Sequence, residues 1–525
     1  MSPRSLAAMV SLLLPPVAAL PLWAQTFAVE DPVLRHIWRE GMEHSHLPRL
    51  AQALLDSVGP RLTGSPGQKA ANDWAVAMYR SWGIPARNEQ YGTWRGWRRG
   101  ITHVDLVKPR VRSLEATMLA WSPGTGGKRI EGKLVILPEF PDSAAFVSWL
   151  PEAKASFVLV SFPQPTCRPD SHWEENGTPE SVQRMKTERD SARARWNLRR
   201  RTGMDPIDAR RRLDQAGALG LLESNWSNGW GVNKIFQART EKGPSIDLSC
   251  EDYGLLYRLA ENRQSPLIRV EAEAEFLGDV PTYNTVAEIP GSERPSEYVM
   301  LSAHFDSWDA SSGATDNGTG SVTMLEAMRI LKAAYPNPKR TILVGHWSGE
   351  EQGLNGSRAF VADHPEIVDG LQALFNQDNG TGRVVNVSAQ GLVDATAHLA
   401  RWFARVPDEI TRHIRLNFPG TPGGGGSDYA SFICTGAPGF SLSSTGFDYG
   451  VYTWHTNRDT YDKLVFDDLK NNATLTAMLA YLASEDPERV PRERRTLFPV
   501  SPQSGEPGSW PSCRDAQRAA PHPGR

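Results

Sequence analysis

Five short stretches in the second half of the chain carry histidine and carboxylate side chains close to the ends of predicted strands. The first contains His304 and, two residues later, Asp306. Asp316 follows twelve residues after His304, in the Gly-rich stretch 313–320. The remaining stretches contribute Glu350 with Glu351, then Asp378, and finally His455. Because mixed imidazole and carboxylate ligation with an open position for water is typical of catalytic zinc sites, this set predicts a zinc site.

Each stretch taken alone has an ordinary structural explanation. A buried histidine is commonly satisfied by a neighbouring Asp, Asp316 could cap the helix that follows it, and adjacent glutamates are often an exposed turn. In a partly buried pocket, however, Glu350 and Glu351 would repel each other unless a cation bound one and the other shared a proton. The complete ordered set therefore favours a metal site over five separate turns.

The elements that must position these side chains are buried strands that alternate with helices. Strands are predicted over 298–303, 340–345, 371–375 and 438–442, and an apolar helix over 320–334. Such alternation predicts an α/β fold with a mixed, mostly parallel central sheet and helices on both faces. Ligands bind beyond the carboxyl ends of the strands in such sheets, which is where most of the candidate residues lie.

The rest of the chain divides into segments that differ in composition and in predicted secondary structure. Residues 25–112 and 269–488 are predicted to form the two parts of one catalytic domain, separated by an inserted domain over 113–268 with short β-rich runs. The last segment, 489–525, is rich in Pro, Ser and Arg, so we predict that it is disordered.

The first 24 residues resemble a secretory signal peptide. Arg4 is their only charge, an apolar stretch runs from Leu6 to Trp23, and Ala24 offers a small residue for cleavage. An uncleaved membrane anchor is the alternative, although three prolines interrupt the stretch. We expect a secreted or periplasmic protein with no membrane span after cleavage, in a compartment where cysteines can oxidise.

Composition excludes two other classes of protein. The chain has 525 residues, with 57 Lys and Arg against 60 Asp and Glu, and its net charge of −3 provides no basic field for nucleic acid. Its 4 cysteines include no Cys-x-x-Cys pair, which excludes a cysteine zinc ribbon and a thioredoxin-like motif. A bound metal must therefore be held by histidines and carboxylates.

The motifs resemble those of the two-zinc exopeptidase family, which includes secreted leucyl aminopeptidases and glutamate carboxypeptidases. The resemblance rests on the runs 302–309 and 348–353, with Asp378 and His455 after them. The segment 59–74 is most similar to the glutamate carboxypeptidase branch. The zinc exopeptidase fold of that family, and a protease-associated-like inserted domain that covers the cleft, are expected on the same ground.

The resemblance implies two Zn²⁺ ions and a role for each residue of the set. Asp316 would bridge both ions, one of which would also bind His304 and Asp378, and the other Glu351 and His455. Glu350 would be the general base for a water held between the metals, and Asp306 would orient the imidazole of His304. Relatives often have a cis peptide after the bridging Asp, so we expect one between Asp316 and Asn317.

Substrate contacts are less determined by the motifs. The loop at 423–432 resembles the pocket loop of the family, which places Ser427, Asp428 and Tyr429 near the substrate. Trp454 stands where some relatives have a Tyr that donates to the oxyanion, which leaves any extra donor unassigned. Asp428 and Asp309 could supply negative charge for a substrate ammonium, which favours amino-terminal or dipeptide cleavage.

The sequence as a whole predicts a secreted zinc exopeptidase that hydrolyses short peptides or dipeptides, and the resemblance is compatible with a homodimer. Three alternatives stay open at this point: carboxypeptidase polarity, a single-zinc glutaminyl cyclase, and a non-catalytic receptor on the same fold.

Overall fold

The structure of the chain is a computed structural model that describes residues 30–199, 206–500 and 505–521. The predicted signal peptide, residues 1–24, lies outside the described residues. Within them, every helix is too short or too polar to cross a membrane.

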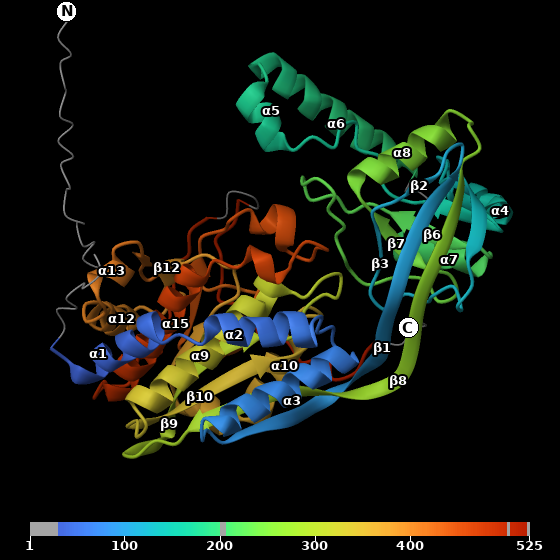
Figure 1. Cartoon of the computed structure of the whole chain (residues 1–525). Coiled ribbons are helices and arrows are strands. Elements are labelled where there is room, and N and C mark those ends of the chain that lie inside the picture. The colour runs from blue at the N-terminus through green and yellow to red at the C-terminus, as the bar shows by residue number, and fades with distance from the viewer. Residues whose placement is uncertain (1–29, 200–205, 501–504, 522–525) are drawn as a thin grey trace, which may run out of the picture.

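The catalytic part is built on a sheet whose central strands are parallel to one another (Figure 1). Strand β9 pairs in parallel with β10 on one side and β11 on the other, and β11 pairs in parallel with β14. Antiparallel neighbours close both sides, with β8 beside β10 and β12 beside β14. The bounds are β8 Leu267–Ile289, β9 Arg294–His304, β10 Arg340–Trp347, β11 Leu371–Asn376, β12 Val384–Ser388, β13 Arg415–Asn417 and β14 Gly439–Ser444.

Side chains of these strands alternate between two hydrophobic layers, because successive residues of a strand point to opposite faces. In β9, Val299 and Leu301 join the larger layer, and Met300 joins the smaller one. The larger layer is completed by the helices α1 Pro32–Trp38, α2 Leu47–Gln52, α3 Pro66–Ser81, α9 Thr319–Ala334, α12 Ala395–Phe403 and α15 Phe466–Glu485, and by Ile410 of α13 Asp408–Thr411. The smaller layer is completed by the helices α10 Asn355–Asp363, α11 Pro365–Gly370 and α14 Tyr429–Ile433. The predicted α/β class, with a mostly parallel sheet between two helical layers, is confirmed.

Two long antiparallel strands connect the catalytic part with the insert. Strand β1, Ala86–Lys108, pairs with β8 from Ala86 opposite Ala287 to Lys108 opposite Leu267. Trp97 and Val104 of β1 already belong to the hydrophobic core of the insert. The predicted boundary after residue 112 therefore falls beyond the point where the chain enters the insert.

The insert contains more helix than strand, which differs from the predicted β-rich domain. Its strands β4, β5, β6 and β7 are parallel to one another, and parallel neighbours require crossover connections, here mostly helical. The strands are β2 Arg112–Ser113, β3 Ala116–Met118, β4 Ile130–Ile136, β5 Ser156–Leu159, β6 Gly220–Glu223 and β7 Ser245–Leu248, and the helices are α4 Ser143–Ala153, α5 Asp170–Asn176, α6 Pro179–Arg199, α7 Pro206–Gln215 and α8 Cys250–Glu261. One connection, the loop 224–244 between β6 and β7, contains no helix and extends toward the catalytic part.

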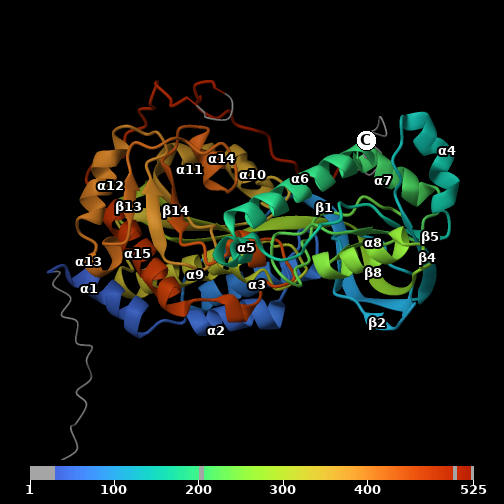
Figure 2. The same ribbon diagram turned by 90° about the horizontal axis from the view of Figure 1, so that it is seen from above.

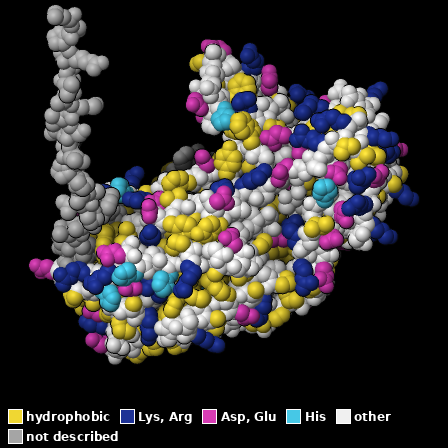
Figure 3. Space-filling view, viewed as in Figure 1, with side chains coloured by type: hydrophobic (Ala, Val, Ile, Leu, Met, Phe, Trp, Pro, Cys, Tyr) yellow, Lys and Arg dark blue, Asp and Glu magenta, His cyan; other side chains and the backbone are white. Residues whose placement is uncertain are grey.

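Helices α5 and α6 form an arm that projects from the insert (Figures 1 and 2). A disulfide between Cys167, next to this arm, and Cys250 at the start of α8 ties it to the insert core. In the space-filling view the arm stands clear of the catalytic part, and the surface between them is hollowed (Figure 3).

The tail, predicted to be disordered, is packed against the catalytic part over its described residues, 489–500 and 505–521. Cys513 forms a disulfide with Cys434 at the end of α14. The indole of Trp510 donates to the carbonyl of Ile433 at 3.0 Å, and Arg518 forms an ion pair with Asp363 at 2.6 Å. The composition correctly indicated that this segment forms no core of its own, but the disulfide and these contacts hold it against the core of the catalytic part. In Figure 2 it crosses the catalytic part toward β1.

Candidate metal centre

The candidate ligands come together because their strands are parallel and end at one edge of the sheet. His304 is the last residue of β9, Glu351 follows β10, and Asp378 follows β11. His455 lies in the loop after β14, and Asp316 lies in the turn Ala314–Gly318 before α9. The five side chains are far apart in sequence and meet at a single place, as the strand-end argument predicts.

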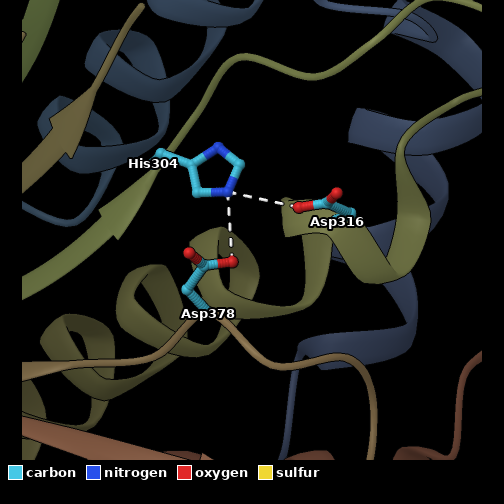
Figure 4. A group of neighbouring side chains, drawn as sticks. All are labelled: His304, Asp316 and Asp378. Atoms are coloured by element: carbon cyan, nitrogen blue, oxygen red, sulfur yellow. Dashed lines mark hydrogen bonds and ion pairs between the residues drawn. The ribbon is translucent and has the colours of Figure 1, made fainter. Parts of the chain in front are cut away.

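The ligand atoms form two groups that share Asp316. His304 Nε2 lies 3.4 Å from Asp316 Oδ1 and 3.2 Å from Asp378 Oδ1 (Figure 4). On the other side of Asp316, His455 Nε2 lies 3.2 Å from Oδ2 and 2.9 Å from Glu351 Oε2. Each group offers three ligand atoms within 4.8 Å of one another, which suits one metal ion per group with Asp316 between them. The peptide after Asp316 is cis, as expected.

Asp306 approaches His304 with its backbone carbonyl as well as with its carboxylate. The Nδ1 of His304 lies 3.0 Å from the carbonyl oxygen of Asp306 and 3.7 Å from its Oδ1. Because a carbonyl oxygen only accepts, Nδ1 carries the proton and Nε2 faces the other ligands. The carboxylate accepts from the backbone N–H groups of Glu350 at 3.2 Å and Glu351 at 3.3 Å, and from the hydroxyl of Thr63. Asp306 thus fixes the glutamate loop as well as the histidine.

Two further residues hold the turn that carries Asp316. Asp459 accepts from the backbone N–H groups of Thr315 at 2.7 Å and of Asp316 at 3.0 Å, and burial raises its pKa to about 7. Arg61 is fully buried and donates to the carbonyls of Phe305 and Gly313 at 2.7 and 2.9 Å. Both residues belong to stretches that resemble the exopeptidase family, but their supporting role is visible only in three dimensions.

The electrostatics of the centre indicate a deficit of positive charge. Burial opposes a charge on His304, but the carboxylates of Asp378 and Glu350 outweigh burial and raise its pKa well above the usual range. For His455, Glu351 and Asp316 likewise outweigh burial and raise the pKa to about 9. Burial, with Asp316 beside it, raises the pKa of Glu351 to about 7. Such a cluster is stabilised by a bound cation, which replaces the protons on these groups.

A buried carboxylate oxygen without a hydrogen-bond partner also favours a bound metal ion. Oε1 of Glu351 is buried and has no hydrogen-bond partner among the described residues. A buried carboxylate oxygen without a partner is costly, and metal coordination would satisfy it. The donor set of two imidazoles and three carboxylates therefore fits metal ions of the zinc type.

Glu350 belongs to neither ligand group, although it lies next to Glu351. It lines a cavity of about 510 Å³ together with Asp316, Glu351, Asp378 and His455. Burial, followed by the charges of Asp378 and Asp428, raises its pKa well above that of an ordinary glutamate, against the opposing effect of His304. A carboxylate with a raised pKa beside a metal centre is suited to accept and return a proton.

Comparison with known proteins agrees with this geometry. Residues 284–480, which include all five ligands, match the model of Peptidase family M28. This part of the chain is therefore similar to the peptidases of family M28. The chain is similar to carboxypeptidase Q of Mus musculus, with 25% identity over 439 residues that cover 84% of this chain and 86% of the relative.

Solved structures share the fold of the chain. A peptidase M28 precursor from Shewanella amazonensis aligns with a TM-score of 0.64 and 24% identity over 87% of this chain and 97% of its own. BSAP, a zinc aminopeptidase from Bacillus subtilis, aligns with a TM-score of 0.54 and 17% identity over 85% and 96% of the two chains. These likenesses confirm the predicted fold class.

Of the residues predicted to contact substrate, Trp454 alone lines the cavity of the metal centre. Its ring stacks on the imidazole of His455 with the centroids 3.9 Å apart. Ser427 accepts a hydrogen bond from Asn376 at 2.8 Å in the interior, and Asp428 is completely buried. Tyr429 packs between the two hydrophobic layers. The cavity wall of the predicted pocket loop is formed instead by Gly424, Gly425 and Gly426.

Neither of the two carboxylates proposed for a substrate ammonium lines the cavity. Asp309 forms a two-pronged ion pair with Arg99, at 2.7 and 2.9 Å. Asp428 is enclosed, and burial raises its pKa to about 7. The preference for amino-terminal or dipeptide cleavage therefore stays a prediction.

Three residues that line the cavity were missed by sequence reasoning: Tyr449, Arg358 and Arg514. Tyr449 begins the turn Tyr449–Thr453, which brings its ring back toward the ligands from five residues before Trp454. Burial, with Asp316 and Asp378 next in effect, raises the pKa of its phenol well above the usual value. The chain thus has a phenol at the cavity, but not at the position adjacent to the last histidine.

The loop 224–244 of the insert holds the last ligand loop. The N–H of Ile235 donates to the carbonyl of His455 at 2.8 Å, and the ammonium of Lys234 lies 4.2 Å from the ring centre of Trp454. His455 has a φ of +61°, a left-handed conformation that costs energy for a residue with a side chain. The hydrogen bond from the insert helps to hold His455 in this conformation.

Proposed function

We propose that this protein is a zinc-dependent exopeptidase that hydrolyses short peptides. The observation that carries the proposal is the pair of ligand groups that share Asp316, with Glu350 beside them and outside both groups. One zinc ion would bind His304, Asp316 and Asp378, and the other Asp316, Glu351 and His455. Three carboxylates would compensate much of the charge of two such ions.

Zinc, when bound, would supply Lewis acidity that polarises the scissile carbonyl and lowers the pKa of water. Glu350 would take the proton from the attacking water and return it to the departing amine, because its carboxylate is free of the ligand groups. Tyr449 would donate its phenol to the oxygen that gains negative charge, the role that Trp454 cannot fill. Trp454, stacked on His455, would limit the access of bulk water to that side of the centre.

Two observations favour this activity over the alternatives. A single-zinc glutaminyl cyclase needs only one ligand group, whereas here Asp316 belongs to two. A non-catalytic receptor needs no proton acceptor, whereas Glu350 lines the cavity with a strongly raised pKa. The disulfides Cys167–Cys250 and Cys434–Cys513 support an oxidising compartment, which agrees with secretion or a periplasmic location.

The test is the conservative variant Glu350→Gln, assayed on a panel of unblocked dipeptides and tripeptides. We expect the variant to keep its zinc, because Glu350 is not a ligand, and to lose turnover by roughly 10²- to 10⁴-fold. The matched control is Glu366→Gln, a largely exposed glutamate on α11, which should leave turnover unchanged. Undiminished hydrolysis by Glu350→Gln would refute the proposed function.

A further inference from the structure

Two neighbouring cavities meet at the point where the tail crosses the catalytic part. The cavity of the metal centre, about 510 Å³, and a second cavity of about 340 Å³ are both lined by Leu354, Arg358, Gly424 and Arg514. Arg358 comes from α10, and Arg514 comes from the tail. Both guanidinium groups therefore stand where the metal centre opens into further space.

These two arginines differ from others near them because they form no close hydrogen bond or ion pair with the described residues, although the carboxylates of Asp428 and Glu350 act on Arg358 from a distance. Among the described residues, neither guanidinium group has a hydrogen-bond or ion-pair partner, whereas Arg518 pairs with Asp363 at 2.6 Å and Arg494 donates to a carbonyl. Burial, followed by the charge of Arg514, lowers the pKa of Arg358. Two like charges without partners at one site favour the binding of an anion between or beside them.

The tail holds Arg514 in place on both sides. Cys513, directly before it, is bonded to Cys434 of the catalytic part. After it, the N–H of Gln517 donates to the side chain of Asn355 at 2.9 Å. Arg514 is exposed but its backbone is fixed, which is the arrangement expected of a binding group and not of a loose surface residue.

We propose that Arg358 and Arg514 bind a carboxylate of the substrate. The inference rests on the proposed function, since it concerns a substrate placed against the same metal centre. A carboxylate accepts parallel hydrogen bonds from guanidinium groups, and both arginines line the cavity that Glu350 also lines. The carboxylate could be the free carboxyl terminus of the peptide or an acidic side chain, and the experiment separates these two sources.

The experiment compares wild type with Arg514→Gln and Arg358→Gln on four peptides: Ala-Ala, Ala-Glu and their C-terminal amides. If the terminal carboxylate binds, each variant should raise KM for both free peptides by roughly 10- to 100-fold with little change in kcat, and should lower the preference for free peptides over amides. If the side chain binds, the preference for Ala-Glu amide over Ala-Ala amide should fall instead. Arg514→Lys should restore part of the lost affinity.

The neighbouring tail residue provides the control. Asp515→Asn changes a side chain that lines only the second cavity, and it should leave all four values of KM unchanged. The double variant Cys434→Ser/Cys513→Ser, which removes the staple and keeps both arginines, should reproduce the loss seen in Arg514→Gln.

Equal effects on every peptide, or unchanged preferences in both arginine variants, would overturn the proposal. Failure of the proposed function is recognised separately. In that case the Glu350→Gln variant and the zinc-free wild type would hydrolyse peptides as fast as the untreated wild type. If hydrolysis depends on both and the preferences still do not change, only the role of the arginines is refuted.

Discussion

The floor of the metal cavity and its rim are built from different kinds of chain. The floor consists of residues at the ends of the parallel strands β9, β10, β11 and β14, whose packing between two hydrophobic layers fixes them. The rim includes Arg514 of the tail and Trp454, which Lys234 of the insert loop 224–244 contacts. Neither the tail nor this loop has helices or extended strands at these points. Chemistry is thus placed on rigid elements, and the groups that surround the substrate are carried by segments that can vary without disturbing the sheet.

The comparison predicts that the largest losses follow changes in the floor. Asp316→Asn removes a charge from both ligand groups at once, so we expect loss of both metal ions and a fall in kcat/KM on the order of 10³ or more. Zinc content and peptide hydrolysis, measured on the same preparation, provide the check. Retention of both ions by this variant would mean that Asp316 is not shared.

Tyr449 lies between the two regions, since its loop follows a core strand but its ring faces the cavity. Tyr449→Phe removes one hydrogen-bond donor, and we expect kcat to fall on the order of 10² while zinc content and KM stay nearly constant. The ring packs against Gly380, at 3.2 Å from the position of an added Cβ, so the phenylalanine should keep the same place. An unchanged kcat would exclude Tyr449 as the donor.

A substitution of Asp306 tests how much the floor depends on the residues that hold its ligand loops in place. Asp306→Asn keeps the backbone carbonyl that accepts from His304, but it weakens the carboxylate contacts to Glu350 and Glu351. We expect a fall of about 10- to 100-fold in activity with His304 ligation retained. A larger loss of zinc than of turnover would show that the carboxylate acts chiefly through the histidine.

Lys234 tests the rim and should give the smallest effect. Lys234→Met keeps the aliphatic length and removes the charge above Trp454, a contact of about 1 kcal/mol. We therefore expect kcat/KM to fall by roughly fivefold, without loss of zinc. Wild-type kinetics in this variant would show that the insert holds the ligand loop by backbone hydrogen bonds alone.

The floor could be predicted from sequence because each of its parts is local. A ligand placed directly after a buried strand inherits its position from the strand, so the meeting of His304, Asp378 and Glu351 follows from the alternation of strands and helices. The shared position of Asp316 and the base role of Glu350 came from family resemblance, because spacing alone does not distinguish a ligand from its neighbour.

The rim could not be predicted because its contacts join segments that are distant in sequence. The tail has too little apolar content to form its own core, and composition therefore indicated disorder. What fixes it is one disulfide, between Cys434 and Cys513, and the pairing of four cysteines cannot be read from their positions. The even number of cysteines in a chain expected to be exported was the available signal that such a staple could exist.

The predicted pocket loop shows the same limit on a smaller scale. Ser427 and Asp428 were placed near the substrate because the surrounding motif resembles the family, yet both side chains point into the interior. The glycines just before them form the cavity wall instead. A motif locates a loop, but the packing of the loop decides which of its residues face the cavity.

The most direct test of the shared two-metal centre is the zinc content of the purified wild-type protein, measured by native mass spectrometry together with elemental analysis. We predict two zinc ions per chain, both removed by a chelator with loss of peptide hydrolysis and both restored with its return. One ion per fully active chain, or hydrolysis that persists without zinc, would contradict the centre proposed on Asp316.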